Sequence, residues 1–200
     1  MRMMKSTLLT LIGAALLCSC GGGKANKSLT GQVTMDGYED RKVYMETTVA
    51  NPTKVDSAIV KDGRFEFNLQ DSVPQVYMLV LAQSDDDQFP ITLPVVSEKG
   101  NIRVFMGELV LTMGTPLNDS LQDFLLALSN YRDQSLADEN VSVEGARKGM
   151  SELLEAAVKQ NIKTPVGAYI YRYYLEFLDE AQRAGILEMA DEDFRKAVNQ

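Results

Sequence analysis

Gly114-Thr115-Pro116-Leu117 is the stretch at which the pattern of the sequence changes. Before it, apolar and polar residues alternate, which is the period of a β-strand; after it, apolar residues recur every three or four positions, which is the period of an α-helix. Thr115 is a favoured N-cap residue, and Pro116 suits the first position of a helix. The sequence therefore predicts an α+β protein with its strands first and its helices second.

The segment 28–114 is predicted to form an antiparallel β-sandwich of about eight strands, because turn residues interrupt its alternating pattern every eight or so positions. Its connections are too short for the helical crossovers that join consecutive parallel strands. The run 75–82 is apolar enough to be an inner strand buried on both faces. Lys61-Asp62-Gly63 predicts a hairpin with a positive φ at Gly63. The predicted strands are 29–35, 42–49, 55–60, 64–69, 75–82, 91–96, 102–106 and 108–113.

The segment 115–200 is predicted to be a helical region of three to five helices, either packed on the sandwich or following it. The first helix starts at Pro116, the second near Ser142, and the third at Pro165, running to about residue 178. Two shorter helices are expected over 181–189 and from 191 onward. With about 180 residues after the leader, the chain is long enough for one well-packed core.

Residues 1–19 have the layout of a secretory signal peptide: a basic start, an uncharged run over 8–17, and then small or polar residues. The run is shorter than the about 20 residues that a membrane-spanning helix needs. Leu17-Cys18-Ser19-Cys20 resembles the bacterial lipobox, which makes Cys20 the predicted lipidation site. Cys18 would place bulky Leu17 where the peptidase requires a small residue. Residues 20–27 are then a glycine-rich tether that acyl chains hold to a membrane.

The charge of the chain argues against nucleic acid as a partner. The net charge is −8; without the leader, which holds Arg2 and Lys5, 18 basic and 28 acidic residues remain, a net charge of −10. Phosphate binding depends on clustered cations, and no run rich in lysine or arginine follows Cys20. The same acidity opposes flat contact with anionic lipid. The membrane partner is therefore expected to be reached through the lipid alone.

The inventory of reactive side chains is short. The sequence has no histidine, and its two cysteines are Cys18 and Cys20. If Cys20 is lipidated and Cys18 leaves with the leader, the folded body has no thiol, which excludes a disulfide, a CxxC pair and a thiolate nucleophile. Without histidine, Ser-His-Asp triads and the usual zinc sites are excluded as well. We therefore expect no catalytic residue, no metal and no cofactor.

Three other features are weaker candidates. Asp85-Asp86-Asp87 could attract a cation, although adjacent carboxylates without loop spacing favour a solvated loop tip. Tyr171 and Tyr174 adjoin the apolar stripe of the third helix and are a candidate interaction patch if exposed; packing against the preceding helix is the interpretation we favour. Three Asp-Ser-apolar triplets resemble an O-glycosylation signal of some Gram-negative envelopes, although strand and helix starts explain two of them. The serines concerned are Ser57, Ser72 and Ser120.

Five motifs in a fixed order carry a family resemblance. They are Leu29-Thr30-Gly31-Gln32-Val33, then Asp56-Ser57-Ala58-Ile59-Val60 with Asp62-Gly63-Arg64-Phe65-Glu66-Phe67, Pro74-Gln75-Val76-Tyr77, Glu98-Lys99-Gly100-Asn101-Ile102, and Gly114-Thr115-Pro116-Leu117-Asn118-Asp119. Together they resemble the lipoprotein module called domain of unknown function 4369, over roughly residues 28 to 130. Thr164-Pro165-Val166-Gly167-Ala168-Tyr169 resembles the segment that follows it.

The resemblance implies a place in the Gram-negative cell envelope, where this module often precedes a thioredoxin-like domain of the thiol-disulfide oxidoreductase kind. This chain departs from that arrangement, because it has no CxxC and ends where such a domain would begin. We therefore expect a non-catalytic, lipid-anchored accessory or binding module on the periplasmic face of the outer membrane. Its expected partner is an envelope protein or a thioredoxin-like domain. The alternative is the N-terminal portion of a membrane-anchored periplasmic oxidoreductase, and a weaker one is a carrier of small ligands.

Overall fold

The computed structural model describes residues 27–84 and 86–199. The predicted signal peptide, the lipidation site Cys20 and nearly all of the tether lie outside these residues. Within them, no helix is both long and apolar enough to cross a membrane.

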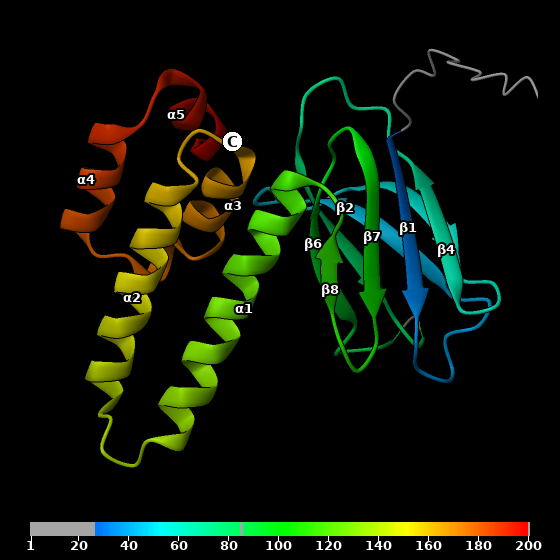
Figure 1. The fold of residues 1–200 in the computed structure, drawn as a ribbon, viewed down its shortest axis with the longest axis horizontal. Helices are drawn as coiled ribbons and strands as arrows, with labels where there is room; N and C mark the ends of the chain where they lie inside the picture. Colours follow the sequence, from blue (N-terminus) through cyan, green and yellow to red (C-terminus); the bar gives the residue numbers. More distant parts are fainter. Residues whose placement is uncertain (1–26, 85, 200) are drawn as a thin grey trace, which may run out of the picture.

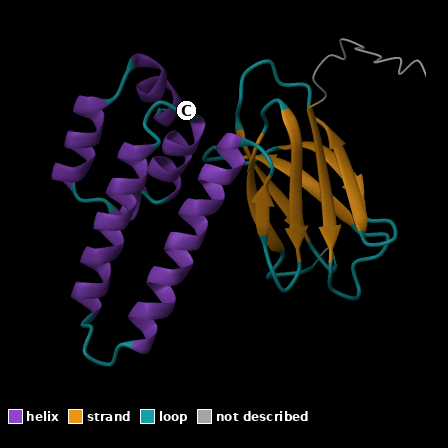
Figure 2. Ribbon diagram, in the orientation of Figure 1, coloured by secondary structure: helices purple, strands orange, loops and turns teal. Residues whose placement is uncertain are grey.

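In the described part of the chain, two four-stranded sheets come first, and five α-helices with one 3-10 turn follow (Figures 1 and 2). The predicted fold class is confirmed. The strands are β1 Lys27–Val33, β2 Lys42–Thr47, β3 Lys54–Ile59, β4 Arg64–Asn68, β5 Val76–Leu81, β6 Ile91–Val96, β7 Gly100–Met106 and β8 Leu111–Met113. The helices are α1 Pro116–Ala137, α2 Val143–Gln160, α3 Pro165–Tyr173, η1 Leu175–Phe177, α4 Glu180–Met189 and α5 Glu192–Val198.

The sheets have the strand orders β4-β1-β7-β8 and β3-β2-β5-β6, and they enclose the first core of the protein. In several strands alternate residues point into this core, as the period of two predicted, although β3 is almost wholly exposed and β6 has four buried residues in succession. In β4, for example, Phe65 and Phe67 are buried while their neighbours are exposed. The outer face of the second sheet contributes Val76 and Val96 to a second core, shared with the helices. Strand β5 is thus an inner strand with apolar contacts on both faces, as predicted.

One strand pair departs from the antiparallel prediction: β1 and β7 are parallel, with Leu29 opposite Ile102. The prediction rested on the length of connections between consecutive strands. These two strands are not consecutive: five strands, which belong to both sheets, lie between them in the chain. Connection length therefore placed no limit on their direction.

The predicted hairpin between β3 and β4 is wrong, because the two strands lie in different sheets. The turn itself has the expected geometry: φ is 50° at Asp62 and 67° at Gly63. Only the bridge between Lys61 and Arg64 forms, and beyond it the chain crosses from one sheet to the other. The local turn chemistry was readable from the sequence, whereas the divergence of the strands depends on the whole sandwich.

Helix α1 starts beside β6 and β8, and the α1–α2 hairpin runs from there away from the sandwich (Figure 1). Thr115 is the N-cap residue, as predicted, but its side chain does not cap the helix. The carboxylate of Glu98 does so instead, accepting from the backbone N–H of Leu117 at 2.7 Å and of Asn118 at 3.2 Å. A carboxylate near the positive end of the helix dipole is stabilising. Helix α1 is therefore fastened to the sandwich from its first turn.

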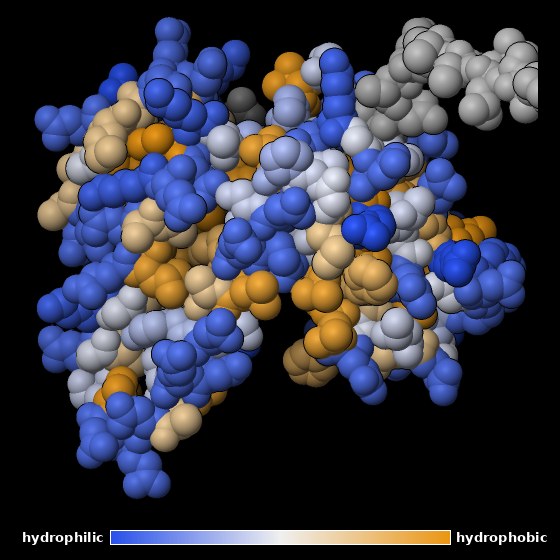
Figure 3. Space-filling view, viewed as in Figure 1, coloured by the Kyte–Doolittle hydropathy of each residue, from blue (hydrophilic) through white to orange (hydrophobic). Residues whose placement is uncertain are grey.

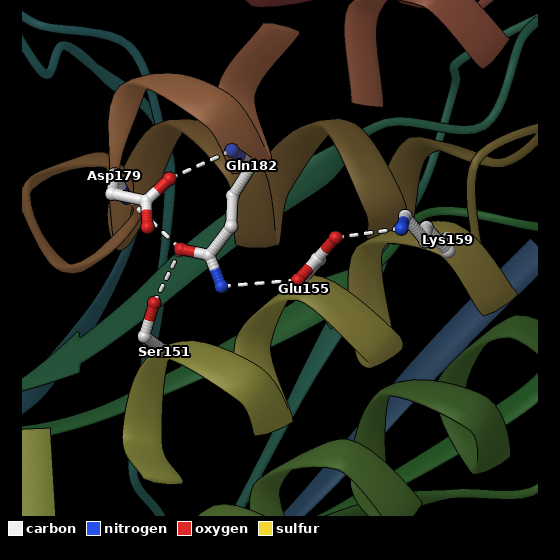
Figure 4. Close-up of polar contacts among 5 residues, drawn as sticks. All are labelled: Ser151, Glu155, Lys159, Asp179 and Gln182. Carbon is white, nitrogen blue, oxygen red and sulfur yellow. Dashed lines mark hydrogen bonds and ion pairs between the residues drawn. The ribbon is translucent and has the colours of Figure 1, made fainter. Parts of the chain in front are cut away.

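A polar network fastens α4 to α2 (Figure 4). Asp179 and Gln182 form a capping box at the start of α4. The Gln182 side chain also accepts from the hydroxyl of Ser151 and donates to Glu155 at 3.0 Å. Lys159 donates to the same carboxylate. This hydrogen bond, and to a smaller extent the one from Gln182, holds the pKa of Glu155 below its usual value. Every polar atom of the Gln182 amide thus has a partner on a neighbouring element.

Candidate functional site

A cleft lies where the sandwich meets the helices. Its inner part has a volume of about 330 Å³ and is lined by the loop after β2, the start of β5 and helix α3. An outer part of about 790 Å³ extends between α3 and α5. The two parts share five lining residues, so they form one continuous hollow: Val73, Pro74, Pro165, Ala168 and Ala197. Ligand sites are often found at such junctions between structural units.

Arg172 is the charged side chain that lines the inner part of the cleft. Helix α3 begins at Pro165, and Ala168 and Arg172 follow three and seven positions later, which places all three on one helical face. Ala168 is buried, so this face is turned toward the sandwich. The helix thereby carries Arg172 to a position where it is only partly exposed.

The hydrogen-bonding capacity of the Arg172 guanidinium is mostly unused within the described part of the chain. Its Nη2 donates to the hydroxyl of Thr48 at 3.3 Å, and that hydroxyl donates to the carbonyl of Val76 at 3.0 Å. Its Nε is buried and has no hydrogen-bond partner among the described residues. A guanidinium offers five N–H donors, and a buried donor without a partner is costly. In a native structure such a group calls for an explanation, such as a functional role or a bound water or ion.

Arg172 also has no carboxylate partner among residues 27–84 and 86–199. The ion pairs there join Lys61 to Asp40, Lys148 to Glu152, and Lys159 to Glu155. Burial lowers the pKa of Arg172 from its ordinary value, yet an arginine stays protonated at neutral pH. The inner cleft therefore contains a partly desolvated positive charge.

The neighbouring groups do not neutralise this charge. Tyr77 lines the same cleft, and its hydroxyl donates to Asp71 at 2.9 Å. Burial, and to a smaller extent this hydrogen bond, raises the pKa of Tyr77 to about 12, so the phenol stays neutral. In the outer part, the cations Lys163 and Lys196 face the acids Asp191 and Asp193. The uncompensated charge is therefore confined to the inner part.

A second hollow, on the outer face of the first sheet, makes a useful contrast. It measures about 560 Å³ and is lined by Arg64, Glu66 and Arg103 among others. All three side chains are exposed, so water solvates their charges. Exposed charges of this kind are worth little as binding anchors, because solvent and salt screen them. Of these two hollows in the described part of the chain, the cleft at Arg172 is the one that contains a partly desolvated cation.

The chemistry of the inner cleft suits a carboxylate. A guanidinium binds a carboxylate through two parallel N–H···O hydrogen bonds, and this pairing strengthens where water is excluded. Thr47, Thr48 and Gln75 provide further polar groups beside Arg172, whereas Val49, Val73 and Ala168 provide apolar wall. The cleft can therefore hold a small molecule or chain end that joins a carboxylate to an aliphatic part.

The two tyrosines predicted as a candidate interaction patch are not an exposed pair. Tyr171 is buried and contacts the ring of Phe194, and half-buried Tyr174 packs edge-on against Phe124. Both rings are packed, but these ring contacts are with α5 and α1 and not with the preceding helix α2, which was the interpretation favoured from the sequence. Tyr173, the last residue of α3, is 56% exposed.

The remaining predicted sites lie apart from the cleft's inner part. Ser57 and Ser72 are exposed, while Ser120 is half-buried and donates to Asn161 at 2.8 Å. Glycosylation stays a prediction for Ser57 and Ser72, but at Ser120 it would break a contact between α1 and α2. Asp87 accepts from two backbone N–H groups of its own loop. No cluster of acidic side chains suited to a metal ion occurs in the part of the chain that the structure describes.

Arg172 was missed from the sequence, although a signal was present. The α3 segment carries Val166, Ala168, Tyr169 and Ile170 on buried positions, and Arg172 follows Ala168 at a spacing of four. A charged residue at a position of an apolar stripe is unusual, because it places a charge where burial is expected. Its partner Thr48 lies 124 positions away and could not be paired with it from the sequence.

The fold defines the class of the protein: an α+β chain in which a two-sheet sandwich is fastened to a helical region through the first turn of α1. Residues 28–121 match the family model described as Domain of unknown function (DUF4369), which covers the sandwich and the first turns of α1. The matched segment ends within α1, so it includes both Glu98 and Asn118 of the contact that joins the two halves. The resemblance stated from the sequence motifs is confirmed. No curated protein matches the chain.

Proposed function

We propose that this chain is a lipid-anchored module of the cell envelope that binds a carboxylate-bearing ligand in the cleft between sandwich and helices, without catalytic chemistry of its own. The observation that carries the proposal is the Arg172 guanidinium, which is partly desolvated and has no carboxylate partner among the described residues. A protein keeps such a costly arrangement where a ligand completes it. Lipidation at Cys20 and a place on the periplasmic face of the outer membrane belong to this proposal.

The size and lining of the cleft limit the ligand. Small-molecule sites are commonly about 300–1,000 Å³, and the inner part measures about 330 Å³. It suits a short aliphatic carboxylate or the last residues of a peptide with a free C-terminus. The acidity of the whole chain repels anions at long range, so binding depends on the local contact with Arg172.

The pKa shifts of three tyrosines and of Asp87 fit a binding role. Burial raises the pKa of Tyr169, Tyr171 and Tyr174, while hydrogen bonds lower that of Asp87. These shifts move each group further from neutrality. A general acid or base works best with a pKa near the working pH, which is the opposite direction.

Replacing Arg172 with methionine tests the cleft. Hexanoate and N-acetyl-alanyl-valine are expected to raise the Tm of the purified protein, whereas their uncharged amides are not. The first probe represents a simple aliphatic carboxylate, and the second represents the C-terminus of a peptide. Arg172→Met is expected to abolish both shifts. In the absence of ligand, the same change is expected to raise the Tm, since it removes an unsatisfied buried donor worth about 1–3 kcal/mol, or about 2–4 °C for each kcal/mol in a chain of this size.

Arg183→Met is the matched control for this experiment. The Arg183 guanidinium donates to the carbonyls of Leu178 at 2.8 Å and Leu175 at 2.7 Å, so its loss should lower the Tm and leave the carboxylate response intact. The proposal fails if no carboxylate raises the Tm at 10 mM, if the amides act equally, or if Arg172→Met responds like the unaltered protein.

Substitution of the two cysteines tests the anchor. Cys20→Ala is expected to prevent acylation and to leave the protein unprocessed or released, whereas Cys18→Ala should be acylated normally. Labelling with an alkynyl fatty acid, followed by separation of inner and outer membranes, measures both steps. Acylation that persists in Cys20→Ala and is lost in Cys18→Ala would reverse the assignment.

A further inference from the structure

The far end of the α1–α2 hairpin exposes large apolar side chains. Leu136 at the end of α1 is 86% exposed, and Val143 at the start of α2 is 89% exposed. Val141, in the loop between them, is also exposed. Single exposed apolar residues are common, but three at one tip form an apolar patch whose exposure to water is unfavourable.

Behind this tip, an apolar groove of about 620 Å³ runs between α1 and α2 toward η1. Figure 3 shows apolar atoms between the two helices on the face in view. Tyr131 holds the helices close here, because its hydroxyl donates to the carbonyl of Ala146 at 2.7 Å. The groove is thus formed before any partner arrives. Its apolar lining consists of Tyr131, Leu136, Val143, Ala146, Met150 and Phe177.

The charges along the hairpin differ between groove and tip. Arg132 and Arg147 line the groove, whereas Asp138, Glu139 and Glu144 surround the tip. None of these five takes part in the ion pairs found among the described residues. Because Glu176 also lines the groove, the two arginines leave it with a net positive charge of one, whereas the tip is acidic, and each has apolar side chains at its centre.

We propose that this hairpin is a self-association surface, in which the tip of each copy lies in the groove of a second copy. A two-fold contact uses the same patch on both subunits, so the patch must carry both a projection and the hollow that receives it. The tip and groove meet this condition, and their opposite charges favour the antiparallel arrangement. This inference is independent of the carboxylate cleft, because the groove and the cleft share no lining residue.

Cross-linking through introduced cysteines tests the contact in native membranes, because the body after Cys20 has no thiol of its own. Under mild oxidation, Val143→Cys is expected to form a disulfide-linked dimer of the chain. Ile59→Cys is the matched control: Ile59 is also an exposed aliphatic residue, at 50%, but lies on β3 of the sandwich. A dimer yield from Val143→Cys no higher than from Ile59→Cys contradicts the proposal. A cross-link to another envelope protein instead of a second copy contradicts it as well.

Sedimentation of the purified full chain in detergent gives the second measurement. Val143→Asp is expected to weaken the dimer at least tenfold by placing a charge in the contact. Folding should be unaffected, since Val143 is the first residue of α2 and an acidic residue suits that position. A chain that remains monomeric at 100 µM, or a dimer that Val143→Asp leaves unchanged, overturns the inference.

Discussion

Asn118→Leu is expected to leave most of the protein unfolded at room temperature. Asn118 lies in the first turn of α1 and is fully buried. Its Oδ1 accepts from the backbone N–H of Val96 at 2.9 Å and from the hydroxyl of Thr112 at 2.8 Å. Its Nδ2 donates to the carbonyl of Val96 and to the hydroxyl of Thr115, both at 2.8 Å. One amide thus satisfies polar groups of β6, β8 and the helix cap.

The magnitude follows from the groups that leucine would leave unpaired. Each buried polar group without a partner costs about 1–3 kcal/mol. Three groups would lose their hydrogen-bond partner: the Val96 N–H, the Val96 carbonyl and the Thr112 hydroxyl. Their sum is comparable with the whole stability of a typical domain, about 5–15 kcal/mol. Leucine keeps the branched shape of asparagine at Cγ but is larger, so overpacking at this buried position adds to the polar loss.

Urea denaturation followed by circular dichroism measures this prediction, with Asn140→Leu as the matched control. Asn140 is exposed in the loop between α1 and α2, and its side chain donates to Asp138 at 3.3 Å. Its replacement should change the free energy of unfolding by less than about 0.5 kcal/mol. Equal denaturation midpoints for the two variants would show that the buried contacts of Asn118 do not hold the sandwich to the helices.

The same region shows which parts of the fold can be predicted from sequence. The start of α1 at Pro116 was predictable, because a cap residue, a proline and a change of apolar period are local signals. The identity of the capping group was not. Glu98 lies 19 positions before Leu117, and only the packing of β6 against α1 brings its carboxylate to the helix. Strand positions were predicted for the same local reason, while the parallel pairing of β1 with β7 depends on the whole chain.

The site was less predictable than the fold because it is made by two halves of the chain. Helix α3 was expected from its proline and its apolar stripe, but its rotation relative to the sandwich depends on tertiary packing. That rotation buries Tyr171 and places Arg172 in the cleft. The absence of histidine, by contrast, can be read directly from the sequence, and it limits the chemistry of any site in the chain.

Gly31→Ala is expected to destabilise the protein strongly, although alanine is normally the better residue. Gly31 lies in the middle of β1, directly opposite Phe65 of β4. A Cβ on Gly31 would lie 2.0 Å from Cζ of the Phe65 ring, which occupies the space above the glycine. Phe65 is 5% exposed and packs edge-on against Phe67, so the ring cannot move aside freely. Overpacking of this kind costs about 1–3 kcal/mol and occasionally more.

Gly185→Ala is the control that separates the steric effect from the general effect of removing a glycine. Gly185 lies within α4, and a Cβ there would meet no atom within 4 Å. This change should stabilise the protein by about 0.5–1 kcal/mol, since alanine loses less backbone entropy in a helix. Equal effects of the two changes in urea denaturation would show that the Phe65 ring does not require a glycine.

A double-mutant cycle with Phe65→Leu identifies the ring as the cause. Phe65→Leu alone should destabilise the protein, because it removes buried apolar surface. In the Gly31→Ala background the same change should cost less or even restore stability, since the smaller side chain makes room for the methyl group. Coupling energies between residues in contact are about 0.5–3 kcal/mol. Additive effects would mean that Gly31 is required for the backbone of β1 and not for the ring that lies over it.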